Sequence, residues 1–309
     1  GRIRELAETR AGHLRRVAAI VEPGRIRPRG FRVVLDAGHG AGGRLAAELL
    51  RDVLGCEALI LGGEPDGRYE HPPEPTEGHL HALTAIVPAV EADVGFAQDP
   101  DADRLAIVDE AGQYIGEELT LALAAHRRLM RETGPVVLNL STSRVAEDLA
   151  TRRGCPVLRT PVGEIHVVER MRAEAALLGG EGNGGVIDPR VGFVRDSFVA
   201  MALVLDLLAL TGEPLSRLVA ALPRYAMVKE KYPLTDATPV AELFDRLAEA
   251  HPDASADRRD GLRLDWPDCW AHVRPSNTEP IVRVIAEAED RERAHELANF
   301  IGRMLSLGC

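Results

Sequence analysis

The stretch Phe31–Val53 (FRVVLDAGHGAGGRLAAELLRDV) contains the pattern that decides the fold. It begins with a β-branched run, Phe31–Asp36, which is typical of a strand, and a turn rich in glycine follows at Gly38–Gly43. Beyond the turn, apolar residues recur at helical spacing, namely Leu45, Leu49, Leu50 and Val53. Strand, tight turn and helix in this order form the first half of a βαβ unit.

The same alternation continues to about residue 222, where parallel strands joined by helices are expected. The expected strands lie at 57–61, 93–97, 136–140 and 157–159, and the expected helices lie near 79–90, 144–153 and 163–175. After Pro223 the order changes, and strand patterns begin to follow one another directly. These later strands are expected at 225–232, 262–265, 269–273 and 281–286, with helices at 240–250 and from Arg291. That order indicates antiparallel pairing.

We therefore predict an α/β protein with two consecutive βαβ three-layer domains and a smaller α+β C-terminal domain. The expected parts are a helical lead-in at 1–28, an α/β domain at 29–112, a second at 113–222 and the α+β domain at 223–309. The last unit follows a stretch punctuated by proline, Pro214–Pro223, and it is large enough for its own core. We expect it to move as a lid over a shared cleft.

Charge and composition exclude several classes of partner. The 309 residues include 37 Lys and Arg against 48 Asp and Glu, a formal net charge of −11, which repels nucleic acid and anionic lipid. No apolar run approaches the ~18 residues of a membrane span. The four cysteines are far apart and form no CxxC pair, which indicates reduced thiols and a cytoplasmic location. The oligomeric state is not predicted.

The segment Asp99–Arg104 (DPDADR), which we call the acidic loop, carries Asp99, Asp101 and Asp103 between two expected strands. Carboxylates at this spacing cannot meet if the strand is straight. They can meet if the backbone curls, and a divalent cation would then offset their repulsion. Arg104 adds a fixed positive charge beside them. The spacing predicts a metal site whose octahedral Mg²⁺ shell retains room for a phosphate oxygen or water.

Two other interpretations apply to the acidic loop. Its three aspartates and Glu110 fall at positions 1, 3, 5 and 12 of an EF-hand calcium loop. Position 6 is Arg104 instead of glycine, however, and the flanking segments have strand patterns, so we reject the EF-hand. A solvated acidic turn that binds no ion is the simpler alternative, and the segment alone does not exclude it.

Two further segments are candidates for binding a sugar phosphate. The arginine turn, Arg274–Pro280 (RPSNTEP), together with Arg283 offers two arginines and three short polar side chains to one phosphate. The Glu181 loop, Gly179–Gly185 (GGEGNGG), allows close backbone approach, and Glu181 and Asn183 offer an acceptor and an amide to hydroxyl groups. An ordinary polar loop and a flexible turn are the respective alternatives, and the second segment taken alone favours the flexible turn.

The turn at Gly38–Gly43, here called the glycine turn, superficially matches a dinucleotide-binding motif. Glycines at 38, 40 and 43 fit G-x-G-x-x-G, but no acidic residue ends the next strand about 20 residues further on. We therefore interpret it as a tight structural turn and assign no catalytic role to His39.

Taken together and in this order, these segments resemble the α-D-phosphohexomutase family, which includes phosphoglucomutases, phosphomannomutases and phosphoglucosamine mutases. The resemblance covers nearly the whole chain, and its most specific parts are the acidic loop and the arginine turn. The matching segments are Val33–Gly43, His71–Thr76, Asp99–Arg104, Thr160–Gly163, Gly180–Gly185 and Arg274–Pro280.

The resemblance implies a phosphohexomutase, an isomerase that moves a phosphoryl group between C1 and C6 of a hexose phosphate. It implies Mg²⁺ as cofactor and a hexose 1,6-bisphosphate as activator. The implied metal ligands are Asp99, Asp101 and Asp103, with Arg104 as electrostatic support for catalysis. The implied contacts to the sugar hydroxyls are Glu181 and Asn183, and those to the substrate phosphate are Arg274, Ser276, Asn277, Thr278 and Arg283.

The chain departs from the family pattern in three places. Family members carry a phosphorylated serine, followed by histidine, in a first domain, whereas about thirty residues precede the first matching strand here and no serine precedes a histidine. Asn183 and Gly185 stand where some members have Ser and His, which blurs the sugar specificity. Pro161 stands where Lys is common, so no general base is assigned there.

The serine matters most, because without it no phosphoryl group can be transferred. We expect residues 1–28 to be the remnant of a missing first domain, and the chain to be an inactive fragment of a four-domain mutase. A non-enzymatic protein that binds sugar phosphates is the alternative function, since the binding loops are retained.

Overall fold

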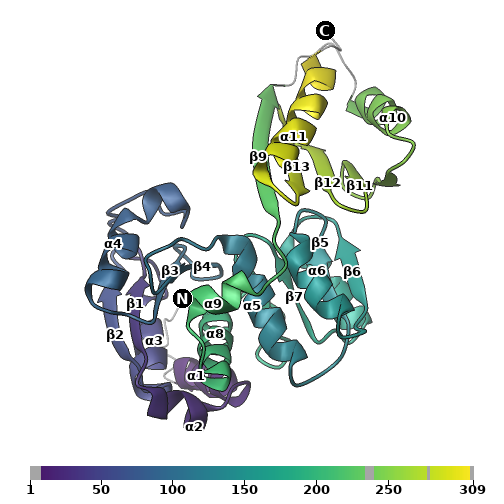
Figure 1. Ribbon diagram of the computed structural model, residues 1–309. Coiled ribbons are helices and arrows are strands. Elements are labelled where there is room, and N and C mark those ends of the chain that lie inside the picture. Colours follow the sequence, from purple (N-terminus) through teal and green to yellow (C-terminus); the bar gives the residue numbers. More distant parts are fainter. Residues whose placement is uncertain (1–7, 234–239, 277–278, 307–309) are drawn as a thin grey trace, which may run out of the picture.

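The computed structural model describes residues 8–233, 240–276 and 279–306, which form three sheets with their covering helices (Figure 1). The strand orders are β2-β1-β3-β4, β6-β5-β7-β8 and β10-β11-β12-β13-β9. This arrangement confirms the predicted α/β fold class. None of the described helices is both long and apolar enough to cross a membrane.

The first sheet contains three parallel strands and one antiparallel strand. They are β1 (Arg32–Asp36), β2 (Glu57–Leu61), β3 (Val94–Gln98) and the antiparallel β4 (Leu105–Asp109). The predicted helix after the glycine turn is confirmed as α3 (Gly43–Glu48), which continues as a π-helix, η2 (Leu49–Val53). The opposite face is covered by α4 (His81–Ala89), which follows the short 3₁₀ helix η3 (Glu77–His79).

The second sheet repeats this topology. It contains parallel β5 (Val136–Asn139), β6 (Val157–Thr160) and β7 (Leu178–Glu181), with antiparallel β8 (Gly185–Ile187) at its edge. The surrounding helices are α5 (Glu117–Leu129), α6 (Arg144–Thr151) and α7 (Glu164–Ala173). In both sheets the third parallel strand turns back as a hairpin. The acidic loop is the hairpin connection in the first sheet, and the Glu181 loop contains the connection in the second.

The C-terminal sheet is antiparallel throughout, as predicted. Its strands are β9 (Ala226–Pro233), β10 (Ser255–Asp257), β11 (Leu262–Asp265), β12 (Trp270–Pro275) and β13 (Ile281–Ala288). Its helices are α10 (Val240–Ala250) and α11 (Arg291–Ser306). Only the short edge strand β10 was not expected, because its three residues (Ser-Ala-Asp) give no apolar alternation.

A helix that the sequence did not predict lies at the centre of the first two domains. Nearly every side chain of α8 (Ser197–Thr211) is buried, and it packs against α5, α1 (Glu8–Ala19) and α2 (Pro23–Ile26). The two sheets therefore share one continuous apolar core, with α8 in its middle. The remaining short helices are η1 (Arg27–Arg29) and α9 (Leu215–Ala220).

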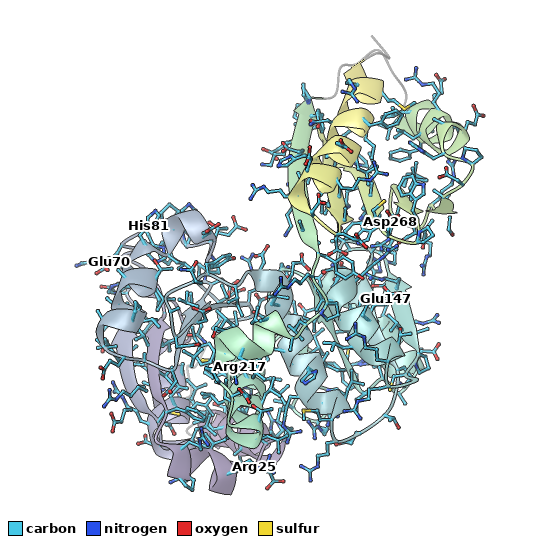
Figure 2. The ribbon with its side chains drawn as sticks, viewed as in Figure 1. Arg25, Glu70, His81, Glu147, Arg217 and Asp268 are labelled. Carbon is cyan, nitrogen blue, oxygen red and sulfur yellow. The ribbon has the colours of Figure 1, made fainter. Side chains whose placement is uncertain are left out.

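The C-terminal domain docks on the second domain through buried polar groups. The buried Glu287 accepts hydrogen bonds from the backbone of Arg144 (3.0 Å) and from the indole of Trp270 (2.6 Å). The guanidinium of Arg144 in turn donates to the carbonyl of Trp266 at 2.6 Å. Figure 2 shows side chains of the two domains meeting between the labelled Glu147 and Asp268. These contacts join the two domains in this structure, and the predicted lid motion stays a prediction.

One ion-pair cluster inside the shared core is expected to be necessary for the stability of the fold. Asp206 of α8 is fully buried and accepts from Arg127 of α5 at 2.6 Å and from Arg25 of α2 at 3.2 Å. Because Arg127 is also buried, the change Asp206→Asn leaves its charge without compensation in the core. We expect a loss of about 3–5 kcal/mol in the free energy of unfolding, measured by urea titration.

The matched control is Glu213→Gln, which removes an ion pair with the exposed Arg217 and is expected to change the free energy of unfolding by less than about 1 kcal/mol. If Asp206→Asn were no more harmful than this control, the cluster would not hold α8 in place.

Candidate functional site

The acidic loop has the curled backbone that its spacing requires. Ala102 adopts a left-handed conformation (φ 61°), and its amide donates to the carbonyl of Asp99 at 3.0 Å. One carboxylate oxygen from each of Asp99, Asp101 and Asp103 lies within 4.8 Å of the others. The three predicted metal ligands are thus brought together at one end of the first sheet.

Two neighbouring segments hold this curl. The amide of Ala41, in the glycine turn, donates to the carbonyl of Pro100 at 2.8 Å. The hydroxyl of Ser197, in the first turn of α8, donates to the carbonyl of Ala102 at 2.7 Å and accepts from the Gln98 amide at 2.7 Å. The glycine turn therefore supports the acidic loop, in agreement with its interpretation as a structural turn.

The contact between the glycine turn and the acidic loop requires glycine, because it leaves no room for a Cβ atom. A Cβ on Gly42 would lie 2.6 Å from the Cβ of Ala102 and 2.7 Å from the side-chain oxygen of Gln98. A Cβ on Gly40 would lie 2.6 Å from the carbonyl oxygen of Pro100. The close approach of two backbones explains the glycines without a nucleotide ligand.

Charge around the acidic loop is unevenly distributed. Burial acts to raise the pKa of Asp99, but the Arg104 backbone (3.0 Å) and guanidinium (2.6 Å) donate to its carboxylate and hold the pKa below its usual range. Burial raises the pKa of Asp103 to about 6, with Arg195 opposing the rise and Asp99 adding to it. Asp103 is thus the carboxylate that would benefit most from an added cation.

The EF-hand interpretation is excluded by the structure as well. Strands β3 and β4 flank the loop where an EF-hand has helices. Glu110, the residue at the twelfth position, accepts hydrogen bonds from the backbone (3.1 Å) and hydroxyl of Ser216.

The Glu181 loop holds its carboxylate rigidly. Glu181 is buried, and one of its oxygens accepts from the side chain of Asn139 and from the backbone of Gly163, each at 2.8 Å. The backbone of the loop is tied down at Gly182, whose amide donates to the hydroxyl of Thr142 at 3.0 Å. Asn183 accepts from the Gly185 amide at 3.2 Å. These contacts argue against a flexible turn with an incidental acid.

A residue that the sequence analysis missed connects these two loops. The guanidinium of Arg195 donates to Glu181 at 2.8 Å and also to the carboxylate of Asp103. The two loops are also joined by their backbones, since the amide of Leu105 donates to the carbonyl of Gly184 at 3.1 Å. Arg195 carries no local motif, and its partners lie 14 and 92 residues away in the chain.

The arginine turn connects β12 and β13, so Arg274 and Arg283 are direct cross-strand partners. Side chains that pair in this way share one face of the sheet. Lys231 of β9 pairs with Arg283 in the same register, which extends the positive row. Asp260 holds Arg274 (3.3 Å) and also accepts from the Val162 amide (2.9 Å), which links this turn to the second domain.

Of the other predicted phosphate contacts, Ser276 accepts from the Glu279 amide at 3.3 Å, whereas Asn277 and Thr278 lie outside the described residues. One cavity of about 610 Å³ nevertheless brings the described groups together. Its lining includes Glu181, Asn183 and Arg195 from the first two domains and Arg274 and Arg283 from the C-terminal domain. The three aspartates do not line it and adjoin it through Arg195.

An ion cluster that the sequence analysis did not predict lies at the N-terminus of α5 and lines the same cavity. Lys229 of β9 pairs with Glu117 at 2.9 Å and with Glu118 at 3.4 Å. Burial raises the pKa of Glu118 to about 7, although Lys229 opposes the rise. The cluster joins the C-terminal domain to the second domain across the cavity.

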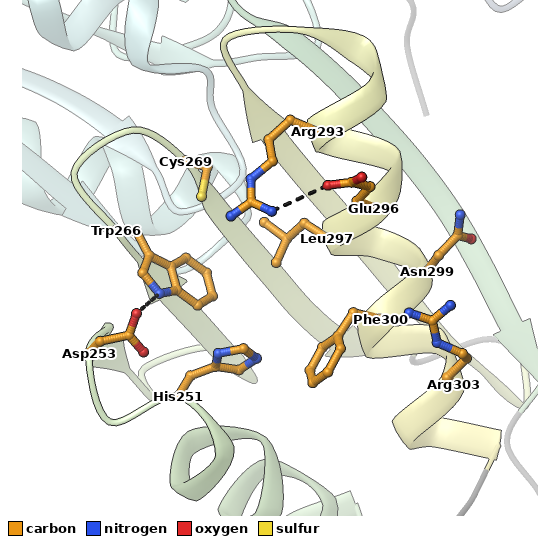
Figure 3. Close-up of a pocket in the computed structure, with 10 residues that line it drawn as sticks. All are labelled: His251, Asp253, Trp266, Cys269, Arg293, Glu296, Leu297, Asn299, Phe300 and Arg303. Carbon is orange, nitrogen blue, oxygen red and sulfur yellow. Dashed lines mark hydrogen bonds and ion pairs between the residues drawn. The ribbon is translucent and has the colours of Figure 1, made fainter.

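A second cavity of about 610 Å³ lies within the C-terminal domain and shares none of these residues (Figure 3). Its wall includes His251, whose ring lies 5.0 Å from those of Trp266 and Phe300 in edge-to-face geometry. Arg293 in this cavity is paired with Glu296 at 3.4 Å. Arg303, on its rim, offers a control cation remote from the first cavity.

The fit between the glycine turn and the acidic loop can be tested by one added methyl group. We expect Gly42→Ala to displace the acidic loop and to lower the free energy of unfolding by about 1–3 kcal/mol. The Mn²⁺ affinity, measured by isothermal titration, should then fall by about tenfold. Gly24→Ala is the control, because a Cβ there meets nothing within 4 Å. Equal Mn²⁺ affinities of the two variants would contradict this role of the glycine turn.

Three family models match consecutive parts of this chain. Residues 11–112 match the model for phosphoglucomutase/phosphomannomutase, alpha/beta/alpha domain II, and residues 116–225 match that for domain III. Residues 231–303 match the C-terminal domain of the same family.

Individual relatives agree with this match. A probable phosphoglucosamine mutase of Methanopyrus kandleri is 39% identical over 87% of this chain and 60% of its own length. A phosphoglucomutase/phosphomannomutase of Thermococcus kodakarensis is 37% identical over 85% of the chain and 58% of its own length. The crystal structure of a phosphoglucomutase/phosphomannomutase family protein from Burkholderia thailandensis superposes with a TM-score of 0.83 at 28% identity, covering 97% of this chain and 64% of that one.

The chain thus spans about 60% of the length of the curated relatives it matches. The matched models are consecutive and together take in all three sheets described above. The chain belongs to the phosphoglucomutase/phosphomannomutase family, the α-D-phosphohexomutases.

Proposed function

We propose that this chain supplies the metal-binding, sugar-binding and phosphate-binding parts of a phosphohexomutase that transfers a phosphoryl group between C1 and C6 of a hexose phosphate. The observation that supports the proposal is one cavity whose lining includes Glu181, Asn183, Arg274 and Arg283, with the clustered aspartates connected to it through Arg195. A carboxylate and an amide suit sugar hydroxyls, and paired arginines suit a phosphate dianion.

The acidic loop fits a divalent cation such as Mg²⁺. Three carboxylate oxygens converge there, and the inner oxygen of Asp103 is buried without a hydrogen-bond partner among the described residues. Oxygen ligands of this number leave coordination positions for a phosphate oxygen and water. A bound ion would neutralise charge on the phosphoryl group during transfer.

The protein residues would divide the remaining work. Arg104 holds Asp99 in place and adds positive charge beside the transferring group, while Arg274 and Arg283 bind the phosphate that is not transferred. Glu181 and Asn183 would orient the ring through its hydroxyls. A hexose 1,6-bisphosphate fits as the activator, because it carries one phosphate for the arginine turn and one for the acidic loop.

Three serines described in or near this cavity, Ser141, Ser143 and Ser197, already make hydrogen bonds within the fold. The hydroxyl of Ser141 donates to His272 (2.8 Å), whose other nitrogen donates to the carbonyl of Asp260 (2.6 Å), and this fully buried histidine joins two domains. Ser143 caps α6, and Ser197 is buried against the acidic loop. We infer that the phosphoserine is supplied from outside these 309 residues and that the chain alone is inactive.

The hydrogen bonds made by these serines also favour the second candidate, a non-enzymatic sugar-phosphate-binding protein, because that function needs no phosphoryl carrier. Both candidates use the same cavity and differ in whether a phosphoserine from outside these residues makes the bound sugar phosphate react. For either function we place the chain in the cytoplasm, because the three described cysteines, Cys56, Cys155 and Cys269, are free and buried.

Binding of glucose 1-phosphate in the presence of Mg²⁺ tests the proposed cavity. Arg274→Ala removes a charge-assisted hydrogen bond of about 1.5–3 kcal/mol, so the affinity should fall about 10–100-fold by isothermal titration. Arg303→Ala, which removes a cation of the same domain outside this cavity, should leave the affinity within about twofold. Equal losses in the two variants would show that the phosphate is not held by the arginine turn.

A turnover assay tests whether this chain alone is a complete mutase, which neither candidate function predicts. With glucose 1-phosphate, Mg²⁺ and a trace of glucose 1,6-bisphosphate, the chain should form no glucose 6-phosphate above the rate in buffer, although it binds the sugar phosphate. A coupled dehydrogenase assay provides the measurement. Saturable turnover that disappears in Asp101→Asn would mean that a phosphoryl carrier exists within the chain.

A further inference from the structure

Arg195 lies between two carboxylates that belong to different binding functions. Its guanidinium donates through Nη1 to the outer oxygen of Glu181 at 2.8 Å and through Nη2 to Asp103. Asp103 is one of the three clustered aspartates, and Glu181 lines the sugar side of the cavity. One side chain therefore contacts both the proposed metal site and the proposed sugar site.

The backbone of Arg195 is fixed, whereas its guanidinium has alternative partners. The Arg195 amide donates to Glu164 at 2.8 Å, and the next residue, Asp196, caps the first turn of α8. Gly185 leaves the space that the aliphatic part of Arg195 occupies, because a Cβ there would collide with it. The Nε of Arg195 is buried without a hydrogen bond among the described groups, with Glu164 at 3.7 Å. Only the end of the side chain is free to change partner.

A cation at Asp103 would change that choice of partner. It would repel the guanidinium, whose Nη2 now contacts Oδ2 of the Asp103 carboxylate, since both are positively charged. The released N–H donors would remain on the cavity wall, where Arg195 already contributes to the lining. A phosphate or hydroxyl oxygen in the cavity could then accept them.

Arg104, the last residue of the acidic loop, differs from Arg195 in that it does not connect the two loops. It is held by Asp99 through both its backbone and its side chain, and its guanidinium also lies 3.4 Å from Glu74 and 3.7 Å from Asp103. None of the contacts described for Arg104 reaches the Glu181 loop.

We propose that Arg195 couples divalent-metal binding at the acidic loop to hexose phosphate binding in the cavity, so that each ligand tightens the other. The inference rests on the proposed function and adds a regulatory link within the same site. Thermodynamic linkage requires the factor to be the same in both directions.

Isothermal titration measures this coupling in four experiments. They give the Kd of glucose 1-phosphate with and without saturating Mn²⁺, and the Kd of Mn²⁺ with and without saturating glucose 1-phosphate. In the wild-type chain each ligand should lower the other's Kd by about fivefold or more. In Arg195→Met both ligands should still bind, but the factor should fall to about one. Mn²⁺ alone should bind more tightly than to the wild type, because a competing cation has been removed.

Two control variants make the result specific. Arg172→Met removes a nearby cation that packs on Phe193 outside the cavity, and it should keep the wild-type factor. Arg195→Lys, which retains a charge but cannot bridge two carboxylates as a fork, should give an intermediate factor.

The possible outcomes separate the inference from the function on which it rests. A wild-type factor of one with both ligands bound would overturn the coupling and leave the proposed function standing. A factor that survives in Arg195→Met would equally overturn it. If the wild-type chain bound neither Mn²⁺ nor glucose 1-phosphate, the proposed function itself would fail, and the coupling with it.

Discussion

The mutual repulsion of three carboxylates in one short loop is the constraint on which the site depends. Asp99, Asp101 and Asp103 meet only because Ala102 takes a left-handed backbone conformation. Such a conformation persists when its surroundings fix it, and here the glycine turn and the start of α8 both hold the loop through hydrogen bonds. Charge is offset by Arg104, which binds Asp99 and lies 3.7 Å from Asp103, and by Arg195, which binds Asp103. The loop is thus shaped in advance for a cation.

The repeated topology of the first two sheets explains why a metal site and a sugar site are adjacent. Each sheet ends in a hairpin after its third parallel strand, and ligands of α/β sheets gather at that edge. The helix α8 lies between the sheets and begins beside both hairpins. Arg195, just before the helix, contacts both the Glu181 loop and the acidic loop, and Ser197, in its first turn, contacts the acidic loop. The C-terminal domain completes the cavity by presenting a row of positive side chains from β9, β12 and β13.

Sequence reasoning succeeded where the signal was local. The strand, turn and helix at Phe31–Val53 and the curl of the acidic loop follow from residue spacing and charge. It failed for α8, because a helix buried on all sides shows no amphipathic period. It also did not predict α5, β7 or β8. Arg195 and the Lys229 cluster were also missed, since their partners are distant in the chain and only the folded sheets bring them together. The assigned roles of Asn277 and Thr278 stay predictions, as do those of the other site residues.

The central claim is that the acidic loop binds a divalent cation through all three aspartates. The most direct measurement is the anomalous difference density of crystals of this chain soaked in Mn²⁺. We expect one strong peak in contact with carboxylate oxygens of Asp99, Asp101 and Asp103 together, and no such peak in crystals of Asp101→Asn. Crystals in which Mn²⁺ binds elsewhere, or in which the loop remains without a peak at saturating Mn²⁺, would contradict the account.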